Sequence, residues 1–246
     1  MASADLDDRL SRIATRWTAV FRAHGTAATQ AEAARHRLML RYSGAAYRYL
    51  LGAVRDPDVA SDLCQDFAVR FLRGDFRRAD PGRGRFRDYV KRALIHLVTD
   101  YHRARQAGPV PLAADAPEPI SPDTLGPDEP DFASGWRQDV LDQTWKTLAE
   151  ENPAFHATLL LRIENPDMQS PEMAERLTAQ LGRPMSPENV RKTLQRAQTK
   201  FADLLLDQVS ESLDSPNADL EAELRELDLL KYCRSALERR RNMDAK

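Results

Sequence analysis

Basic and aromatic residues gather between residues 70 and 105 of this 246-residue chain. The stretch holds eleven lysines and arginines against four aspartates, although the whole chain has a net charge of −2. Cationic side chains contact phosphates and release counterions. Aromatic side chains such as Phe86, Tyr89 and Tyr101 can stack on unpaired bases for about 1–3 kcal/mol each. The pattern favours binding to melted, single-stranded DNA, although a solvated arginine face above ordinary core aromatics would give the same pattern.

A second polar cluster opens a helix that is expected over Pro187 to Val209. Ser186 is a good N-cap before it, and Gly182 suits the end of a preceding helix expected over Pro171 to Leu181. Two helices joined in this way form a helix-turn-helix arrangement, whose second helix presents its N-terminal end to base edges in the major groove. An ordinary antiparallel helix pair is the alternative. The candidate residues for reading duplex DNA are Ser186, Asn189, Arg191, Lys192, Gln195 and Arg196.

An acidic helix face precedes the basic stretch, in the sequence DLCQDFAVRF from Asp62 to Phe71. Asp62 and Asp66 are four residues apart on a predicted helix, where two like charges are mildly unfavourable. No lysine lies nearby to relieve this pair, and a basic protein partner would explain it. An acidic face that is merely solvated is the simpler alternative.

The sequence offers no pattern for catalysis. The five histidines are scattered, and no HExxH motif, GxSxG motif or phosphate-binding glycine loop occurs. Cys64 and Cys233 lie outside any CxxC motif or Cys/His cluster and are expected to be reduced thiols without a metal role. We therefore predict that the protein is not an enzyme and needs neither a metal nor another cofactor. No N-terminal apolar segment occurs, and no apolar run approaches the roughly 18 residues that span a bilayer, so a cytoplasmic protein is expected.

Apolar residues recur at steps of three and four along most of the chain, which is the spacing of amphipathic helices. No strand-like alternation and no internal repeat occurs, so the predicted fold class is all-α. A loop is expected over residues 74–84. The predicted helices cover residues 5–24, 27–54, 57–72, 86–105, 136–150, 153–163, 171–181, 187–209 and 217–241.

An acidic, proline-rich segment divides the chain. From Gly108 to Asp131, seven prolines alternate with acidic residues, and no lysine or arginine occurs. Such a segment cannot bury enough apolar surface to offset its ordering entropy and behaves as a stiff linker. Two small helical domains are therefore expected. The predicted boundaries are 1–107 for the first domain, 108–133 for the linker, 134–212 for the second domain and 213–246 for a C-terminal helical extension.

Three segments of the chain resemble the bacterial sigma factors of the extracytoplasmic-function type, within the sigma-70 family. DLCQDFAVRFL is similar to the helix that docks on the polymerase clamp, and FRDYVKRALIHLVTDYHRAR is similar to the segment that melts and reads the minus-ten promoter element. PEMAERLTAQLG followed by SPENVRKTLQRAQTKF resembles the helix-turn-helix that reads the minus-thirty-five element. The resemblance runs from about Trp17 to Val209 and implies a region 2-like helical bundle and a region 4-like helix-turn-helix domain.

The chain departs from the family pattern at three places. His96 stands where the family often has asparagine. Extra residues between Ala174 and Val190, including Gly182-Arg183-Pro184, lengthen the helix-turn-helix and resemble variants of planctomycete-like bacteria. The helix expected over residues 217–241 lies beyond the usual end of the family, where it could be a regulatory cover, a partner-binding helix or a stabilising brace.

The resemblance implies a dissociable promoter-specificity subunit of RNA polymerase. Its partners would be core RNA polymerase and promoter DNA, both melted and duplex, with an anti-sigma factor or other regulatory protein left open. Two alternatives remain: a sigma-like interaction protein without promoter selection, and a dimeric helix-turn-helix repressor. The residues implied in core docking are Asp62, Gln65, Asp66 and Phe71. Those implied at the opened minus-ten element are Arg87, Tyr89, Lys91, Arg92, His96, Tyr101 and Arg103. Reading of the upstream duplex falls to the six candidates from Ser186 to Arg196.

Overall fold

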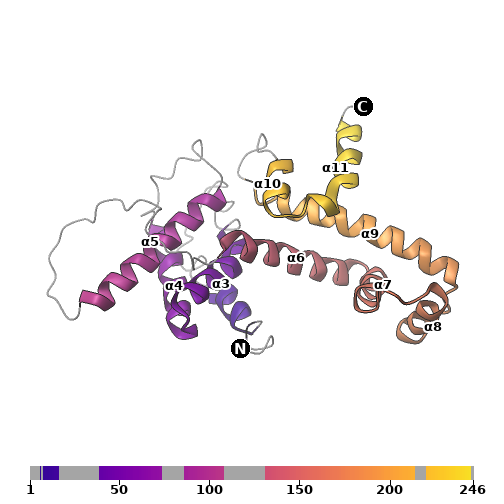
Figure 1. Ribbon diagram of the computed structural model, residues 1–246, viewed down its shortest axis with the longest axis horizontal. Helices are drawn as coiled ribbons and strands as arrows, with labels where there is room; N and C mark the ends of the chain where they lie inside the picture. The colour runs from indigo at the N-terminus through magenta and orange to yellow at the C-terminus, as the bar shows by residue number, and fades with distance from the viewer. Residues whose placement is uncertain are drawn as a thin grey trace, which may run out of the picture. The chain divides into compact units, whose positions relative to one another are not determined.

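The computed structural model describes residues 6, 8–16, 39–73, 86–107, 131–213 and 220–244 (Figure 1). Every regular element within these residues is a helix and none is a strand, which confirms the all-α fold class. The predicted loop over 74–84 and residues 108–130 of the predicted linker lie outside them. The chain divides into two compact units: unit 1 comprises Met1–Asp139 with Leu213–Pro216, and unit 2 comprises Val140–Ser212 with Asn217–Lys246.

Three helices form the centre of unit 1, namely α3 (Ser43–Val54), α4 (Pro57–Arg73) and α5 (Phe86–Ala107). Their contacts enclose the fully buried side chains of Tyr47, Leu50, Phe67 and Leu94. Asp56 caps α4, because its carboxylate accepts hydrogen bonds from the backbone N–H groups of Asp58 and Val59 at 2.9 and 3.2 Å.

The first two predicted helices differ from the structure in their bounds. Within the predicted helix over 5–24, residues 8–16 are described and are helical. Within the predicted helix over 27–54, residues 39–41 are helical, but Tyr42 adopts a turn and α3 begins only at Ser43. The Tyr42 side chain is buried, so the turn places an aromatic ring inside unit 1.

The first two turns of α6 (Phe132–Glu151) belong to unit 1. The helix begins earlier than the predicted residue 136, because the Asp131 carboxylate accepts a hydrogen bond from the backbone N–H of Ala133 at 3.0 Å and caps it. Asp139 of the same helix forms an ion pair with Arg48 of α3. Both side chains are largely buried, with 12% and 17% of their surface exposed.

Aromatic rings complete the contact between α6 and α3. The Trp136 ring stacks on Tyr42 with centroids 4.2 Å apart, and the Phe132 ring meets Tyr49 edge-on at 6.0 Å. All four side chains are buried. We call Tyr42, Tyr49, Phe132 and Trp136 the α3–α6 aromatic cluster.

Gly44 of α3 lies directly beneath the Asp139 carboxylate. A Cβ atom at residue 44 would lie 2.6 Å from both carboxylate oxygens, so we expect Gly44→Ala to break the ion pair with Arg48. The uncompensated charges outweigh a gain of about 1 kcal/mol in helix propensity, and we expect the free energy of unfolding to fall by about 1–2 kcal/mol. The matched control is Gly135→Ala, whose Cβ would meet its nearest atom at 3.7 Å and which we expect to stabilise the protein. Urea denaturation measures both, and equal stability of the two variants would contradict this packing.

Unit 2 is built from the rest of α6 together with α7 (Pro153–Glu164), α8 (Ser170–Leu181) and α9 (Pro187–Ser210). One core cluster, around Leu177, lies where α7, α8 and the start of α9 meet. A second cluster, around Leu204, joins α6, α7 and the middle of α9.

The bounds of α8 and α9 agree with the prediction to within a residue. Gly182 ends α8 with a φ of 65°, and the Ser186 hydroxyl accepts a hydrogen bond from the backbone N–H of Asn189 at 3.2 Å, which caps α9. Ser170 precedes Pro171 and Glu172 as Ser186 precedes Pro187 and Glu188, which predicts an N-cap at Ser170, but the structure does not place the cap there. The carbonyl of Gln169 already accepts the first helical hydrogen bond, from the backbone N–H of Met173 at 3.0 Å, so the helix begins one residue earlier.

The C-terminal extension forms two helices, α10 (Leu220–Glu226) and α11 (Leu230–Asp244), and not the single helix predicted over 217–241. Asp228 separates them with a left-handed φ of 53°. The backbone N–H of Leu229 reaches back to the carbonyl of Leu224 at 2.8 Å, which is the long hydrogen bond of a Schellman motif.

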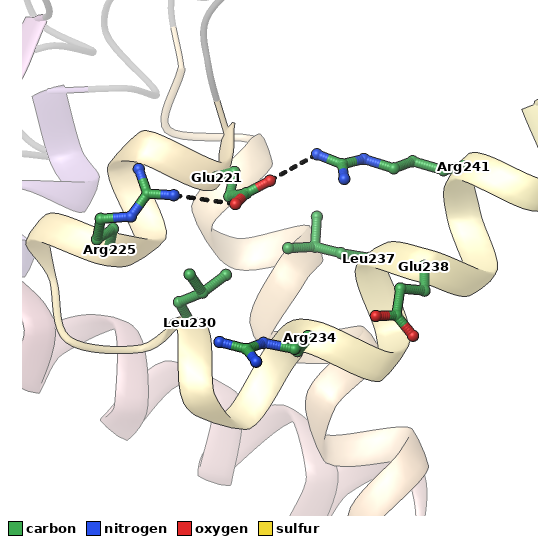
Figure 2. Close-up of a pocket in the computed structure, with 7 residues that line it drawn as sticks. All are labelled: Glu221, Arg225, Leu230, Arg234, Leu237, Glu238 and Arg241. Carbon is green, nitrogen blue, oxygen red and sulfur yellow. Dashed lines mark hydrogen bonds and ion pairs between the residues drawn. The ribbon is translucent and has the colours of Figure 1, made fainter.

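Both C-terminal helices pack against α9. Arg239 and Arg240 of α11 form ion pairs with Asp203 and Asp207 of α9, at 2.7 and 2.5 Å. A pocket lies between α10 and α11 (Figure 2), where the Glu221 carboxylate accepts hydrogen bonds from Arg225 and Arg241. Arg225 lies on the same helix as Glu221, so the bond from Arg241 is the one that ties α10 to α11. The pocket is lined by Glu221, Arg225, Leu230, Arg234, Leu237, Glu238 and Arg241.

Cys233 of α11 is fully buried, and burial raises the pKa of its thiol from 9.0 to about 12. The native state buries the neutral thiol and disfavours the thiolate. The contribution of the buried thiol to the free energy of unfolding is therefore complete below the unfolded pKa of 9.0 and is lost as the pH rises from there toward 12. We expect the stability advantage of the wild type over Cys233→Ala to shrink between about pH 8 and about pH 10.5. Urea titrations of both proteins at each pH measure it, and a constant difference would contradict the assignment.

Candidate protein and nucleic-acid interfaces

The predicted acidic face lies on the solvent side of α4. Asp62 and Gln65 are exposed and Asp66 is half-buried, whereas Cys64 and Phe67 point into the core. The three polar residues follow one another at steps of three and one, which keeps them on one side of the helix. Asp62, Gln65 and Asp66 can therefore contact one partner surface together.

Phe71 does not share that face. It is five residues after Asp66, about 140° further around the helix, and its ring meets Phe86 of α5 edge-on with centroids 6.3 Å apart. The side chain is half-buried. Phe71 therefore helps to join α4 to α5, and the structure does not bring it together with the other three docking candidates.

Arg70 supplies the positive charge that the sequence analysis did not find beside the acidic pair. Its guanidinium lies 2.9 Å from Asp66 on the same helix and 3.7 Å from Asp100 of α5. These side chains are each about 40% exposed, so each pair contributes only about 0.2–1 kcal/mol. The arrangement links the acidic face of α4 to the helix predicted to read DNA.

The solvent side of α5 carries a basic stripe that we define as Arg92, His96 and Arg103. These three residues are exposed and follow one another at steps of four and seven, which places them on one face. The opposite face is buried through Val90 and Leu94. The stripe is the part of the minus-ten prediction that solvent and a nucleic acid can reach.

The other minus-ten candidates are less accessible. Arg87 is only 5% exposed, and Tyr89 and Lys91 are half-buried. Burial raises the pKa of the Tyr89 hydroxyl well above its usual value. Tyr101 is half-buried and its hydroxyl accepts from Arg105 at 3.2 Å. The structure therefore divides the seven candidates into an exposed stripe and a partly enclosed group.

All six upstream candidates lie on the exposed side of α9 or at its cap. Arg191, Lys192, Gln195 and Arg196 fall within an arc of about 140° on a regular helix. Lys192 pairs with Glu188 at 2.7 Å, whereas the Ser186 hydroxyl caps the helix. Val190 is buried on the opposite side of α9, so the face with the four candidates is turned toward solvent.

Arg162 is a residue that the sequence analysis did not single out. Its guanidinium donates hydrogen bonds to the carbonyls of Pro166 and Met168, both at 2.9 Å, and also contacts the sulfur of Met173 at 2.9 Å. It therefore fixes the turn between α7 and α8 and with it the start of α8. An arginine in the last turn of a helix gives no sequence signal for this role.

The described ranges hold no group of three or more His, Cys, Asp or Glu side chains that could bind a metal ion. Within the same ranges, no helix is both long and apolar enough to span a bilayer.

A comparison with protein families finds one match, between residues 38–108 and the model for sigma-70 region 2. The match covers less than a third of the chain and is narrower than the resemblance from Trp17 to Val209. No curated protein and no solved structure matches the chain. Residues 38–108 contain α3, α4 and α5, so the acidic face and the basic stripe both lie within the matched segment. Residues 38–108 are therefore similar to sigma-70 region 2, and this match supports the assignment of the chain to the sigma-70 family.

Proposed function

We propose that this protein is a sigma factor of the extracytoplasmic-function type, which binds core RNA polymerase in the cytoplasm and directs transcription initiation. The match of residues 38–108 to sigma-70 region 2 carries the proposal. Two independent features of the same segment support it, an exposed acidic face on α4 and an exposed basic stripe on α5.

The two surfaces suit two different partners. Asp62, Gln65 and Asp66 offer an acidic contact for a basic surface of core polymerase. The basic stripe of α5 offers cations to the phosphates of an opened minus-ten element. Arg87 and Phe71 act in this proposal as packing residues that hold α5 in place.

Transcription from a purified system tests the proposal. The full chain is added to core polymerase with a library of genomic fragments from the source organism, and transcript start sites are mapped. We expect promoter-dependent transcripts that share one upstream motif. The variant Arg92→Ala with Arg103→Ala should bind core normally but lose most of these transcripts, whereas Arg137→Ala, a half-buried cation of α6, should retain them.

Absence of any promoter-dependent transcript would sink the proposal. Tight binding of the chain to duplex DNA as a dimer, without polymerase, would indicate a repressor instead. Binding to core polymerase without transcripts would indicate an interaction protein.

We also propose that the exposed face of α9 reads duplex DNA upstream of the minus-ten element. Arg191 and Arg196 are exposed, and a guanidinium group can make bidentate contacts with guanine. We expect Arg196→Ala to weaken binding of the holoenzyme to its preferred upstream site by about 1–3 kcal/mol and to relax the base preference at one position. Lys192→Ala should weaken all sites about equally. Competition assays with single-base variants of the site measure both, and an unchanged base preference in Arg196→Ala would contradict the assignment.

A further inference from the structure

The turn between α8 and α9, residues 182–186, has a fixed backbone. Gly182 adopts a left-handed φ of 65°, and the backbone N–H of Met185 donates to the Thr178 hydroxyl at 3.0 Å. Leu181 before the turn and Met185 within it both pack against the first core cluster of unit 2. A side chain that projects from this turn therefore starts from a defined position.

Arg183 is the charged residue of this turn. Its side chain is exposed and stands between Gly182 and Pro184. The sequence from Glu175 to Glu188 has no other acidic residue between these two. Among the described residues, no carboxylate pairs with the Arg183 guanidinium. The group is therefore open to a ligand from outside the chain.

The other cations of α8 and α9 divide into two groups. Arg191 and Arg196 are exposed, and neither forms an ion pair within the part of the chain that the structure describes. They are already proposed to contact bases, so Arg183 is the guanidinium that base reading leaves unused. The cations held by glutamates, at 3.0, 2.7 and 2.6 Å, are Arg176, Lys192 and Lys200.

The position of the turn on DNA follows from the docking of a helix-turn-helix. Its first helix crosses the DNA backbone, and the second enters the major groove with its N-terminal end at the base edges. The turn that joins the two helices then lies beside a row of phosphates. The groove is only about 12 Å wide. Arg183, which stands three residues before the N-cap Ser186, can therefore reach that row with its long side chain.

We propose that Arg183 binds a backbone phosphate beside the upstream site and attaches the helix-turn-helix to the duplex there. The inference rests on the proposed role of α9 in reading duplex DNA. It adds a residue outside the six upstream candidates and gives it a different role. Arg183 supplies affinity that does not depend on base sequence, because a phosphate contact carries no sequence information directly. The contact itself is a charge-assisted, bidentate pair of hydrogen bonds.

The salt dependence of DNA binding tests this role. Each phosphate contact contributes about −0.9 to the slope of log affinity against log salt concentration. We expect Arg183→Ala to make this slope less steep by about 0.9 and to weaken binding about fivefold to tenfold at about 0.1 M salt. The loss should be equal for the preferred upstream site and its single-base variants. Fluorescence anisotropy of labelled duplex fragments measures both, with holoenzyme assembled from the full chain and core polymerase.

Two further variants serve as controls. Arg183→Lys should keep the salt slope, because an ammonium group also binds phosphate as a point charge. Arg234→Ala removes the same charge from an exposed position of α11 and should bind as the wild type does. The helix α11 pairs with Asp203 of α9, which lies about 25 Å along the helix from Ser186, at the other end from α8 (Figure 1). Because the replaced side chains are exposed, all three variants should unfold at the same urea concentration as the wild type.

The outcomes separate the inference from the proposed function. If the wild-type holoenzyme prefers no upstream site, the proposed role of α9 fails and the phosphate contact fails with it. If the wild type has such a preference but Arg183→Ala keeps the wild-type salt slope, the role of α9 stands and the phosphate contact is overturned. A loss that differs among single-base variants would also overturn it, because Arg183 would then read a base.

Discussion

A chain that carries Asp62→Lys with Asp66→Lys is expected to lose at least about 100-fold in affinity for core RNA polymerase. The two carboxylates lie on the exposed side of α4, opposite the buried Cys64 and Phe67, so the double reversal changes the charge of a surface without removing core contacts. A basic partner surface would then face two new cations, and placing like charges together at an interface is worth several kcal/mol. Titration of labelled protein with core polymerase, followed by fluorescence anisotropy, measures the effect.

The control reverses two exposed acids on another helix, Asp142→Lys with Glu150→Lys on α6. It adds the same charge to the chain, so it corrects for any general attraction or repulsion between the chain and the polymerase. We expect its affinity to stay within about twofold of wild type. Equal affinities for the two double variants would show that α4 is not the docking helix.

The second large effect is expected from removal of residues 217–246. The C-terminal extension buries six apolar side chains and its two helices pack against α9, so the shortened chain exposes apolar surface on both sides of a lost contact. We expect unit 2 to lose more than about 4 kcal/mol of stability. Thermal denaturation followed by circular dichroism measures it. The buried apolar side chains are Leu224, Leu227, Leu229, Cys233, Ala236 and Leu237.

This experiment also separates the roles left open for the C-terminal extension. A stabilising brace predicts a poorly folded shortened chain, whereas a regulatory cover predicts a stable one that binds core polymerase or DNA more tightly. Removal of residues 245–246 alone is the control and should change nothing. A shortened chain with an unchanged melting temperature would contradict the brace.

Local sequence signals were sufficient for the helices that position the candidate interfaces. Ser186, Gly182 and Asp56 act through their own side chain or backbone on the next few residues, so their caps and helix ends can be read from a short stretch of sequence. The start of α6 was missed for the opposite reason. Phe132 continues the apolar spacing of Trp136 and Val140, but it follows an acidic, proline-rich segment whose composition favours a linker.

The candidate site could be predicted only in part, because burial depends on the neighbouring helix. Arg87 and Arg92 look alike in sequence, yet Arg92 is exposed whereas Arg87 is buried. The assignment of Phe71 to the docking face failed in the same way, because the sequence of α4 does not show that this ring contacts Phe86 of α5. The break at Asp228 had no glycine or proline to announce it and depends on a left-handed aspartate.

Arg70 has a consequence for how variants of unit 1 combine. Because one guanidinium lies near both Asp66 and Asp100, a change at either carboxylate alters the pairing of the other. The energetic effects of substitutions on α4 and α5 should therefore not add, even when one is measured by protein binding and the other by DNA binding. A double-mutant cycle of Asp66→Asn and Asp100→Asn should show a coupling of about 0.5 kcal/mol or more, and Arg70→Gln should abolish it. The effect of a charge substitution on α4 would then depend on the charges of α5, and the reverse would hold as well.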